Sequence, residues 1–169
     1  TDGKTVRFDQ SFGFSYVGLI FLVLLTVPNL IWTRHKPKDY DHYQCQENKY
    51  LTLLERVGEV LVTCLVLIFS DFNWHSWTNW NWWLIAAALC MLLYEIFWIR
   101  YFMGPKRMAD FYAPILKIPV AGASLPVIAV LCLAIYGKNL FLALAAIILG
   151  IGHIGIHLQY QNMIRKDNH

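Results

Sequence analysis

His153 and His157 are the residues of this chain whose type and spacing most directly suggest chemistry. They lie four residues apart in an apolar stretch near the end of the sequence, residues 150–157. On a helix that spacing is slightly more than one turn, so both imidazoles point to the same side. Two imidazoles on one side of a helix can bind one metal ion, transfer protons or hydrogen-bond to a neighbouring helix.

The elements that would carry these histidines are apolar helices. Of the 169 residues, 57% are hydrophobic and 15% are charged, whereas about 25% charged residues is usual for a soluble domain. The hydrophobic residues gather in five blocks, at about 14–32, 57–74, 82–101, 113–136 and 140–160. Each block is close to the ~20 residues that a helix needs to cross a membrane. The sequence predicts one all-α domain over residues 1–169, a polytopic integral membrane protein with a bundle of about five transmembrane helices.

The distribution of Lys and Arg predicts the orientation of this bundle. Eleven of them fall on one side of the predicted spans: Arg34, Lys36, Lys38, Lys49, Arg56, Arg100, Lys106, Arg107, Lys117, Arg165 and Lys166. The other side has three: Lys4, Arg7 and Lys138. Positively charged loops stay in the cytosol, so we expect an outside N-terminus and a cytosolic C-terminus, in the plasma or an inner membrane. We attribute the net charge of +3 to this orientation and expect no nucleic-acid partner.

Tryptophans crowd the connection between the second and third predicted spans, which has no Lys or Arg. Five of the seven lie there: Trp74, Trp77, Trp80, Trp82 and Trp83. Indole rings concentrate at the level of the lipid headgroups, so this cluster predicts an aromatic belt at the outer interface. A platform on which a ligand stacks is the alternative.

The four cysteines show no pattern typical of a disulfide or a redox site. Cys64, Cys90 and Cys132 fall in separate predicted spans and Cys45 in a loop, and no CxxC motif occurs. Single buried cysteines usually act as small apolar side chains. We therefore expect no disulfide or redox chemistry.

Polar side chains within the predicted spans gather in the cytosolic half of the membrane. At 1.5 Å per residue, His153 lies roughly 5 Å from the midplane and His157 roughly 11 Å. Glu95 falls at about the depth of His153, and Glu59 and Asn29 also lie in this half. Ionisable groups are costly in a bilayer, so groups at one level are expected to share a cavity. We predict a cytosol-facing cavity, with residues 34–50 as a mobile lid, lined by Asn29, Glu59, Tyr94, Glu95, His153 and His157.

Other charged residues near these spans receive structural interpretations. Glu55 shares a helix face with Glu59, but we place it in the aqueous approach to the second span. Arg56 is three residues before Glu59 and can pair with it. Arg100 and Lys117 lie near the interface, where long basic side chains extend toward lipid phosphates.

The fourth predicted span is interrupted by Pro114, Pro119 and Pro126. Proline removes a backbone hydrogen bond from a helix, so we expect bends, with Ser124 or a neighbour satisfying the freed carbonyls. An unwound segment or hinge that faces the cavity is the functional alternative.

Small residues recur along the fifth predicted span: Ala143, Ala146, Gly150, Gly152 and Gly155. Such spacings let another helix approach closely. The glycines on either side of His153 can equally leave room for a ligand.

The pair of histidines also predicts a candidate metal site. Its ligands would be His153, His157, Glu95 and Glu59, and its ion Zn²⁺, Fe²⁺ or Mn²⁺. Strong metal motifs add a third ligand at a fixed local spacing, as in HExxH, and this sequence has none. Two histidines of one helix cannot take opposite axial positions on one haem, which argues against haem within one subunit. Without a metal, a Glu–His pair can relay protons or act as acid and base.

Three functions are compatible with these features. The leading expectation is a small-molecule or lipid binding or transport protein, in which the Glu–His pair allows proton coupling. The alternative is an intramembrane enzyme that uses His153 with Glu95 or Glu59 on an amphiphilic substrate. The second alternative is a structural subunit of a membrane assembly whose polar residues only join helices. The expected partners are membrane lipids, a small-molecule or lipid ligand, and a second copy of the chain packed through small residues.

Overall fold

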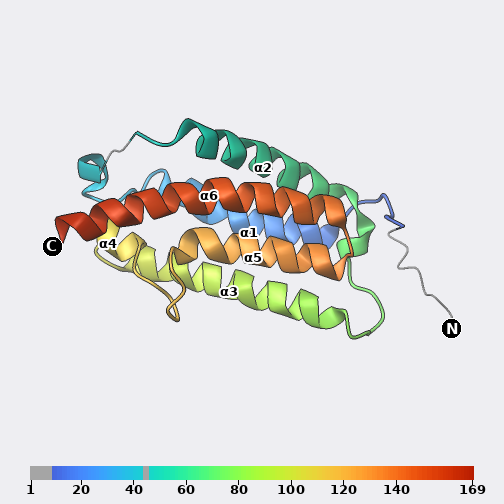
Figure 1. The fold of residues 1–169 in the computed structure, drawn as a ribbon. Coiled ribbons are helices and arrows are strands. Elements are labelled where there is room, and N and C mark those ends of the chain that lie inside the picture. Colours follow the sequence, from blue (N-terminus) through green and yellow to red (C-terminus); the bar gives the residue numbers. More distant parts are fainter. Residues whose placement is uncertain (1–8, 44–45) are drawn as a thin grey trace.

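A computed structural model describes residues 9–43 and 46–169, and over these ranges the chain is a bundle of helices (Figure 1). The five long helices are α1 (Tyr16–Trp32), α2 (Lys49–Ile68), α3 (Asn81–Met103), α5 (Ala121–Tyr136) and α6 (Leu140–Asp167). The short ones are η1 (Tyr40–Tyr43), η2 (Ser70–Phe72) and α4 (Met108–Phe111). Within the described ranges the backbone forms isolated bridges and no β-strand. Lys4, Arg7 and Cys45 lie outside these ranges.

Three of the long helices begin at side chains that accept hydrogen bonds from free backbone N–H groups. Ser15 caps α1, Asn48 caps α2 and Asn139 caps α6, at donor–acceptor distances of 2.8, 2.9 and 2.9 Å. Ser and Asn are suited to this position because their short side chains reach the amides of the first turn. Only a short link joins α5 to α6, so these two helices are antiparallel neighbours.

α5 is the central helix and lies between α3 and α6 (Figure 1). Twelve of its 16 residues are buried, whereas the other long helices each expose one side. α5 lies close against α3 at Gly122, where a β-carbon would lie 2.7 Å from the ring of Phe97. α2 packs on α6, and α1 bridges α2 and α3. α5 thus packs against α3 and α6, and α1 and α2 pack in turn against these two helices.

The fourth predicted span is helical only in its second part. α5 begins at Ala121, and residues 113–120 form a loop. A residue that precedes proline avoids the helical conformation, so Pro114 and Pro119 prevent an earlier start. Val120 completes the break with a left-handed φ of 43°.

Two side chains hold this loop in place. The Ser124 hydroxyl donates to the carbonyl of Pro119 at 2.9 Å, so Ser124 satisfies a carbonyl at the break, as expected. Arg100 donates to the carbonyls of Ala113 and Pro114 at 2.6 and 3.0 Å. A guanidinium presents several donors in one plane, which suits two adjacent carbonyls. The prediction that Arg100 extends toward lipid phosphates is therefore wrong.

The ends of α2 and α6 differ from the limits of the hydrophobic blocks. α2 begins at Lys49 because the cap at Asn48 lets its charged first turns be helical. It ends at Ile68, before Phe69 pairs in an extended conformation with Phe12. α6 continues beyond its block to Asp167. Hydrophobic periodicity marks the apolar part of a helix and misses charged ends.

Two helices, α3 and α6, are long and apolar enough to cross a membrane by length and composition. α1 and α5 are apolar but shorter, with 17 and 16 residues. The first half of α2 carries several charged side chains. The prediction of an all-α helical bundle is confirmed over the described ranges, and the five-span arrangement stays a prediction.

The clustered tryptophans lie at the end of the bundle opposite to the C-terminus, between α2 and the first turn of α3 (Figure 1). Each exposes 41–60% of its surface: Trp74, Trp77, Trp80, Trp82 and Trp83. Exposed rings at one end fit an interfacial belt, which stays a prediction. Cys64, Cys90 and Cys132 are free thiols.

Candidate functional site: a cleft between α1 and α2

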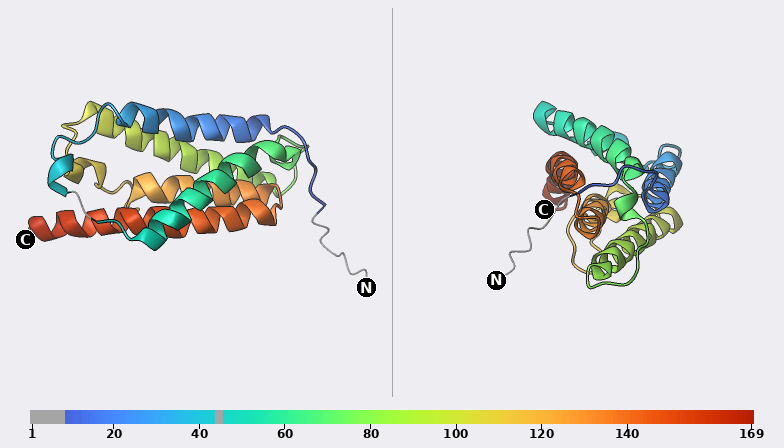
Figure 2. Two further views of the ribbon diagram at one scale, coloured as in Figure 1. Left: turned by 90° about the horizontal axis from the view of Figure 1, so that it is seen from above. Right: turned by 90° about the vertical axis from the view of Figure 1, so that its right-hand side faces the viewer.

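α2 crosses the bundle obliquely, from α1 at one end to α6 at the other (Figure 2). Near its last turn α2 meets α1, where the carbonyl of Val66 fills the space that a side chain at Gly18 would need. Near its first turn α2 meets α6, where a β-carbon at Gly152 would lie 2.6 Å from the Leu51 carbonyl and against the Glu55 amide. α1 and α2 therefore diverge toward the C-terminal end of the molecule, and a cleft opens between them.

The glycines of α6 near His153 serve helix packing. Gly152 faces the backbone of α2, and Gly155 faces the side chain of Leu51. Gly58 of α2 meets the backbone of Leu149 in the same way. The prediction that small residues admit a second helix is confirmed here, and α2 fills the space that the alternative assigned to a ligand.

The cleft contains a cavity of about 370 Å³, which we name the cleft cavity. All five long helices contribute to its lining. Its polar lining residues are Thr26, Asn29, Glu59, Thr63, Tyr94 and His153, and its apolar ones are Leu22, Leu25, Val62, Pro126, Val127, Val130 and Leu149. The structure thus brings together four of the six residues that the sequence placed in one cavity.

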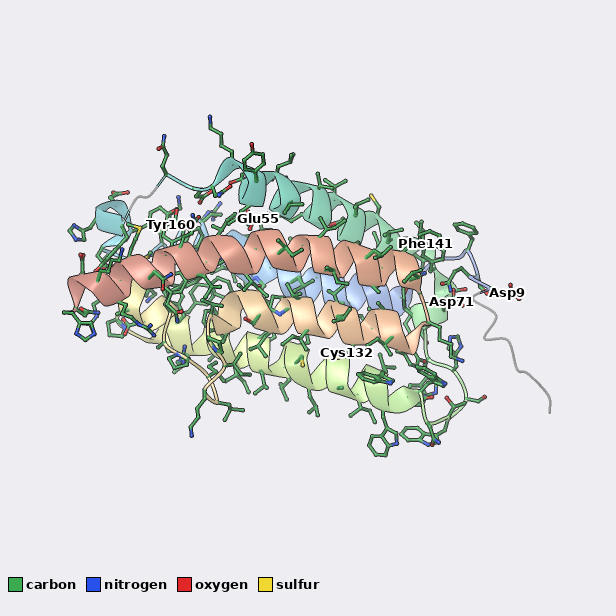
Figure 3. The ribbon with its side chains drawn as sticks, in the orientation of Figure 1. Asp9, Glu55, Asp71, Cys132, Phe141 and Tyr160 are labelled. Atoms are coloured by element: carbon green, nitrogen blue, oxygen red, sulfur yellow. The ribbon has the colours of Figure 1, made fainter. Side chains whose placement is uncertain are left out.

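A second cavity of about 180 Å³ adjoins it, and we name it the aromatic cavity. It is lined by Asn29, Trp32, Tyr40, Glu47, Glu55, Trp98, Met108, Phe111, Tyr112, Ile156, His157 and Tyr160. Asn29 lines both cavities. Figure 3 shows Glu55 beside α6 and Tyr160 further along α6 toward the C-terminus. The aromatic cavity therefore lies on the C-terminal side of the cleft.

Glu55 and His153 form a short hydrogen bond between α2 and α6. The Glu55 Oε1 and His153 Nδ1 atoms are 2.6 Å apart, and the two side chains expose 16% and 24% of their surface. An ionised carboxylate has no hydrogen to donate, so in this contact Nδ1 of His153 is the donor and Oε1 of Glu55 is the acceptor. Gly152 makes the contact possible because it lets the backbone at Glu55 lie against α6.

His157 faces the aromatic cavity and has a partner of its own. Its Nδ1 shares a hydrogen bond of 2.8 Å with the Tyr112 hydroxyl, and its ring centre lies 4.6 Å from that of His153. The two imidazoles lie on the same side of α6, as predicted, but their Nδ1 atoms bind different residues. Glu55, His153, His157 and Tyr112 thus form a row of polar side chains that joins the two cavities.

Glu95 lines neither the cleft cavity nor the aromatic cavity, so the structure does not bring it together with His153 there. Its neighbour Tyr94 faces the cleft, exposes 2% of its surface and accepts a hydrogen bond from the Asn29 amide at 3.0 Å. The next residue on a helix lies about 100° further around the axis. Glu95 therefore points away and lines neither cavity. The carboxylate that His153 binds belongs to Glu55.

The four predicted metal ligands are not brought together. No group of three or more His, Cys, Asp or Glu side chains in the described ranges is arranged to hold a metal ion. Glu95 points away from His153, and Glu59 forms an exposed ion pair with Arg56 at 3.6 Å. This ion pair agrees with the structural interpretation of Arg56. A pair so exposed contributes little to stability.

Sequence reasoning missed Glu55 and the aromatic residues around it. The charge of Glu55 suggested an aqueous position, although it shares a helix face with Glu59. The signal that could have found it is Gly152, because a small residue beside a histidine in an apolar helix lets a second helix approach closely. Nothing in the local sequence indicates that Trp98 and Tyr112 line one cavity.

The segment predicted to be a lid, residues 34–50, is held to the C-terminal end of the bundle where the structure describes it. The Met108 amide donates to Asp39 Oδ1 at 2.8 Å, and the Tyr101 hydroxyl donates to the His35 carbonyl at 2.8 Å. These bonds place the segment over the aromatic cavity, to which it contributes Tyr40 and Glu47. Motion of this segment stays a prediction.

Comparisons with known proteins give no relative for this chain. No protein-family model matches it, and neither a curated protein nor a solved structure matches it. The side chains of the cleft cavity and the aromatic cavity are therefore the guide to function.

Proposed function

We propose that this chain is a multi-pass membrane protein in which α1, α2, α3, α5 and α6 cross the bilayer and the α1–α2 cleft binds an amphiphilic molecule. The N-terminus would lie outside and the C-terminus in the cytosol, so both cavities would lie in the cytosolic half. The observation that carries the proposal is the Glu55–His153 pair, which is half-buried in the wall of a cleft between two apolar helices.

The outward surfaces of the long helices support a membrane location. Large apolar side chains are exposed along α1, α2, α3 and α6: Leu19, Ile20, Val23, Val27, Leu30, Leu53, Val57, Val60, Leu61, Leu89, Leu92, Ile96, Ile99, Phe141, Leu144, Ile147 and Ile151. A soluble monomer rarely exposes an apolar patch beyond a few hundred Å². At 1.5 Å per residue, α1 and α5 are about 26 and 24 Å long, close to the ~30 Å of hydrocarbon.

The shape of the cleft supports an amphiphilic ligand. A cleft between two membrane helices is open to lipid at its side, so a molecule with an apolar chain can enter it directly. The apolar lining, with Leu22, Val62 and Val127, suits that chain, and the hydrogen-bonded pair of Glu55 and His153 suits a polar end. Hydrogen bonds to this pair would replace the hydrogen bonds to water that the polar end of the ligand loses on burial.

Native mass spectrometry of the protein purified in a mild detergent tests this proposal. We expect an amphiphile of defined mass to remain bound, and occupancy to fall roughly tenfold in Glu55→Gln and in His153→Gln, since a hydrogen bond to a charged group is lost. Arg56→Gln is the matched control, because Arg56 is exposed on the same helix next to Glu55. Equal occupancy in all three variants would refute the role of the pair.

A second candidate function is acid–base catalysis on the bound amphiphile. One observation favours it: Glu55 binds Nδ1 of His153, so Nε2 is the nitrogen through which this residue of the cleft cavity would exchange a proton with a ligand. A carboxylate that orients an imidazole in this way is the arrangement of a general base. A loss of turnover in His153→Gln larger than its loss of ligand occupancy would support catalysis, and an unchanged ligand after prolonged incubation with the unchanged protein would favour binding or transport.

A further inference from the structure

We infer that the aromatic cavity binds a methylated ammonium group, the chemistry shared by choline-type lipid headgroups and free choline-like cations. This inference deepens the proposed function, because it names the polar end of the amphiphile. If the methylated ammonium belongs to a lipid headgroup, the inference rests on the proposed function. If it belongs to a free cation, the inference requires only the aromatic cavity.

Six of the twelve residues that line this cavity are Trp, Tyr or Phe: Trp32, Tyr40, Trp98, Phe111, Tyr112 and Tyr160. The rings touch one another, with centres 5.6 Å apart for Trp32 and Tyr40 and 6.1 Å for Trp32 and Phe111. The face of an aromatic ring carries negative potential, and tryptophan attracts cations most strongly. Several rings around one space are the usual means by which proteins recognise quaternary ammonium.

The charges in the lining also select a cation. Glu47 and Glu55 line the cavity, and no Lys or Arg is among the described residues that do so. Glu55 already accepts a hydrogen bond from His153, and Glu47 Oε1 accepts one from the Tyr160 hydroxyl at 3.0 Å. A methylated ammonium needs only the charge of these carboxylates, because a quaternary nitrogen has no hydrogen to donate. The same carboxylates disfavour an anionic ligand.

The chain itself places an ammonium group on two of these rings. Nζ of Lys36 lies 5.5 Å from the ring centre of Trp32 and 5.1 Å from that of Tyr40. Both distances fall within the ~6 Å over which a cation is attracted to a ring face. Lys36 is exposed and is not one of the residues that line the cavity.

The size of the cavity suits a small organic cation. Its volume of about 180 Å³ is comparable with the ~150 Å³ of an engineered cavity that holds one benzene molecule. A trimethylammonium group is compact enough for such a space. The cavity adjoins the cleft cavity at Asn29, so the rest of an amphiphile can continue from one into the other.

Isothermal titration with choline chloride tests the free cation. The comparison ligand is the uncharged analogue of choline in which carbon replaces nitrogen, and the detergent carries no ammonium group. We expect choline to bind roughly tenfold more tightly than the analogue. Trp32→Leu and Glu47→Gln should each weaken binding severalfold, whereas Trp82→Leu, at the exposed tryptophan cluster, should not. Glu47 is exposed, so Glu47→Gln tests the charge without disturbing the core.

Lipid nanodiscs test the headgroup as the source. We expect the protein to retain phosphatidylcholine in preference to phosphatidylglycerol, with the preference lost in Glu47→Gln. Retention of phosphatidylcholine without binding of free choline would identify the ligand as a lipid. Equal binding of choline and its analogue, together with no lipid preference, would overturn the inference. If binding of an amphiphile still requires Glu55 and His153 in that case, the proposed function stands and only the methylated ammonium is ruled out.

Discussion

Replacing Gly152 with alanine should push α2 away from α6 and break the Glu55–His153 hydrogen bond. A β-carbon at Gly152 would lie 2.6 Å from the Leu51 carbonyl, whereas ordinary contact begins at 3.4 Å. The backbones must therefore separate by at least about 0.8 Å, the difference between these distances, because the Glu55 amide lies closer still. The same displacement takes Glu55 Oε1 from 2.6 Å to about 3.4 Å from His153 Nδ1. That separation is too long for a charge-assisted hydrogen bond, which spans about 2.7–2.9 Å.

The size of the effect follows from three contributions to the free energy of unfolding. Forcing an extra methyl group into a packed interface costs about 1–3 kcal/mol. Loss of a hydrogen bond to a charged group costs a further ~1.5–3 kcal/mol. Alanine recovers up to about 1 kcal/mol because it favours the helix more than glycine does. The net loss is about 1.5–6 kcal/mol, which lowers Tm by at least ~3 °C for a chain of this length.

Thermal unfolding in one detergent, followed by circular dichroism, measures this loss. Gly155→Ala is the matched control, because a β-carbon there would lie 3.0 Å from the terminal methyl groups of Leu51, which can rotate away. We expect Gly155→Ala to keep or slightly raise Tm through its helix propensity. Equal Tm values for the two variants would show that backbone contact at Gly152 does not position α2.

Three further predictions concern other contacts of the bundle. Ser124→Ala should lower the free energy of unfolding by about 1 kcal/mol, because the carbonyl of Pro119 loses its hydrogen-bond donor. Chemical denaturation measures this free energy, and an unchanged value would contradict the prediction. Arg100→Gln should speed limited proteolysis in the loop before α5, because two carbonyls are released there, and an unchanged cleavage rate would count against that anchor. Gly18→Ala should lower Tm by several degrees, because the new methyl group collides with the Val66 carbonyl. A Tm equal to that of the unchanged protein would show that α1 and α2 do not meet at Gly18.

The helical elements were largely predictable from the sequence, because each apolar block contains the middle of one long helix. The errors lie at helix ends, where other forces decide. Asn48 extends α2 backward through charged turns, and Pro114 and Pro119 delay the start of α5. Hydrophobicity carries no information about either effect, whereas capping and proline geometry do.

The positions of the site residues along the helix axes were predictable from the sequence, but the hydrogen-bond partner of His153 was not. Counting residues along a helix gives a position along the axis, and that placed Asn29, Tyr94 and His153 together correctly. It does not give the direction around the axis, so it predicts Glu95 or Glu59 as the partner of His153. The true partner, Glu55, depends on the oblique path of α2, which long-range contacts between helices determine.

The position of Asn29 in the lining of both cavities has a consequence for α1. α1 contacts α2 at Gly18, and Asn29 lies about 17 Å further along α1, where it donates to the Tyr94 hydroxyl. A rotation of α1 by about 10° about Gly18 would move Asn29 by about 3 Å, enough to break that bond and change the width of both cavities. On the proposed function, a ligand that moved α1 from within one cavity would thereby alter the other, and the two occupancies would be thermodynamically linked in both directions.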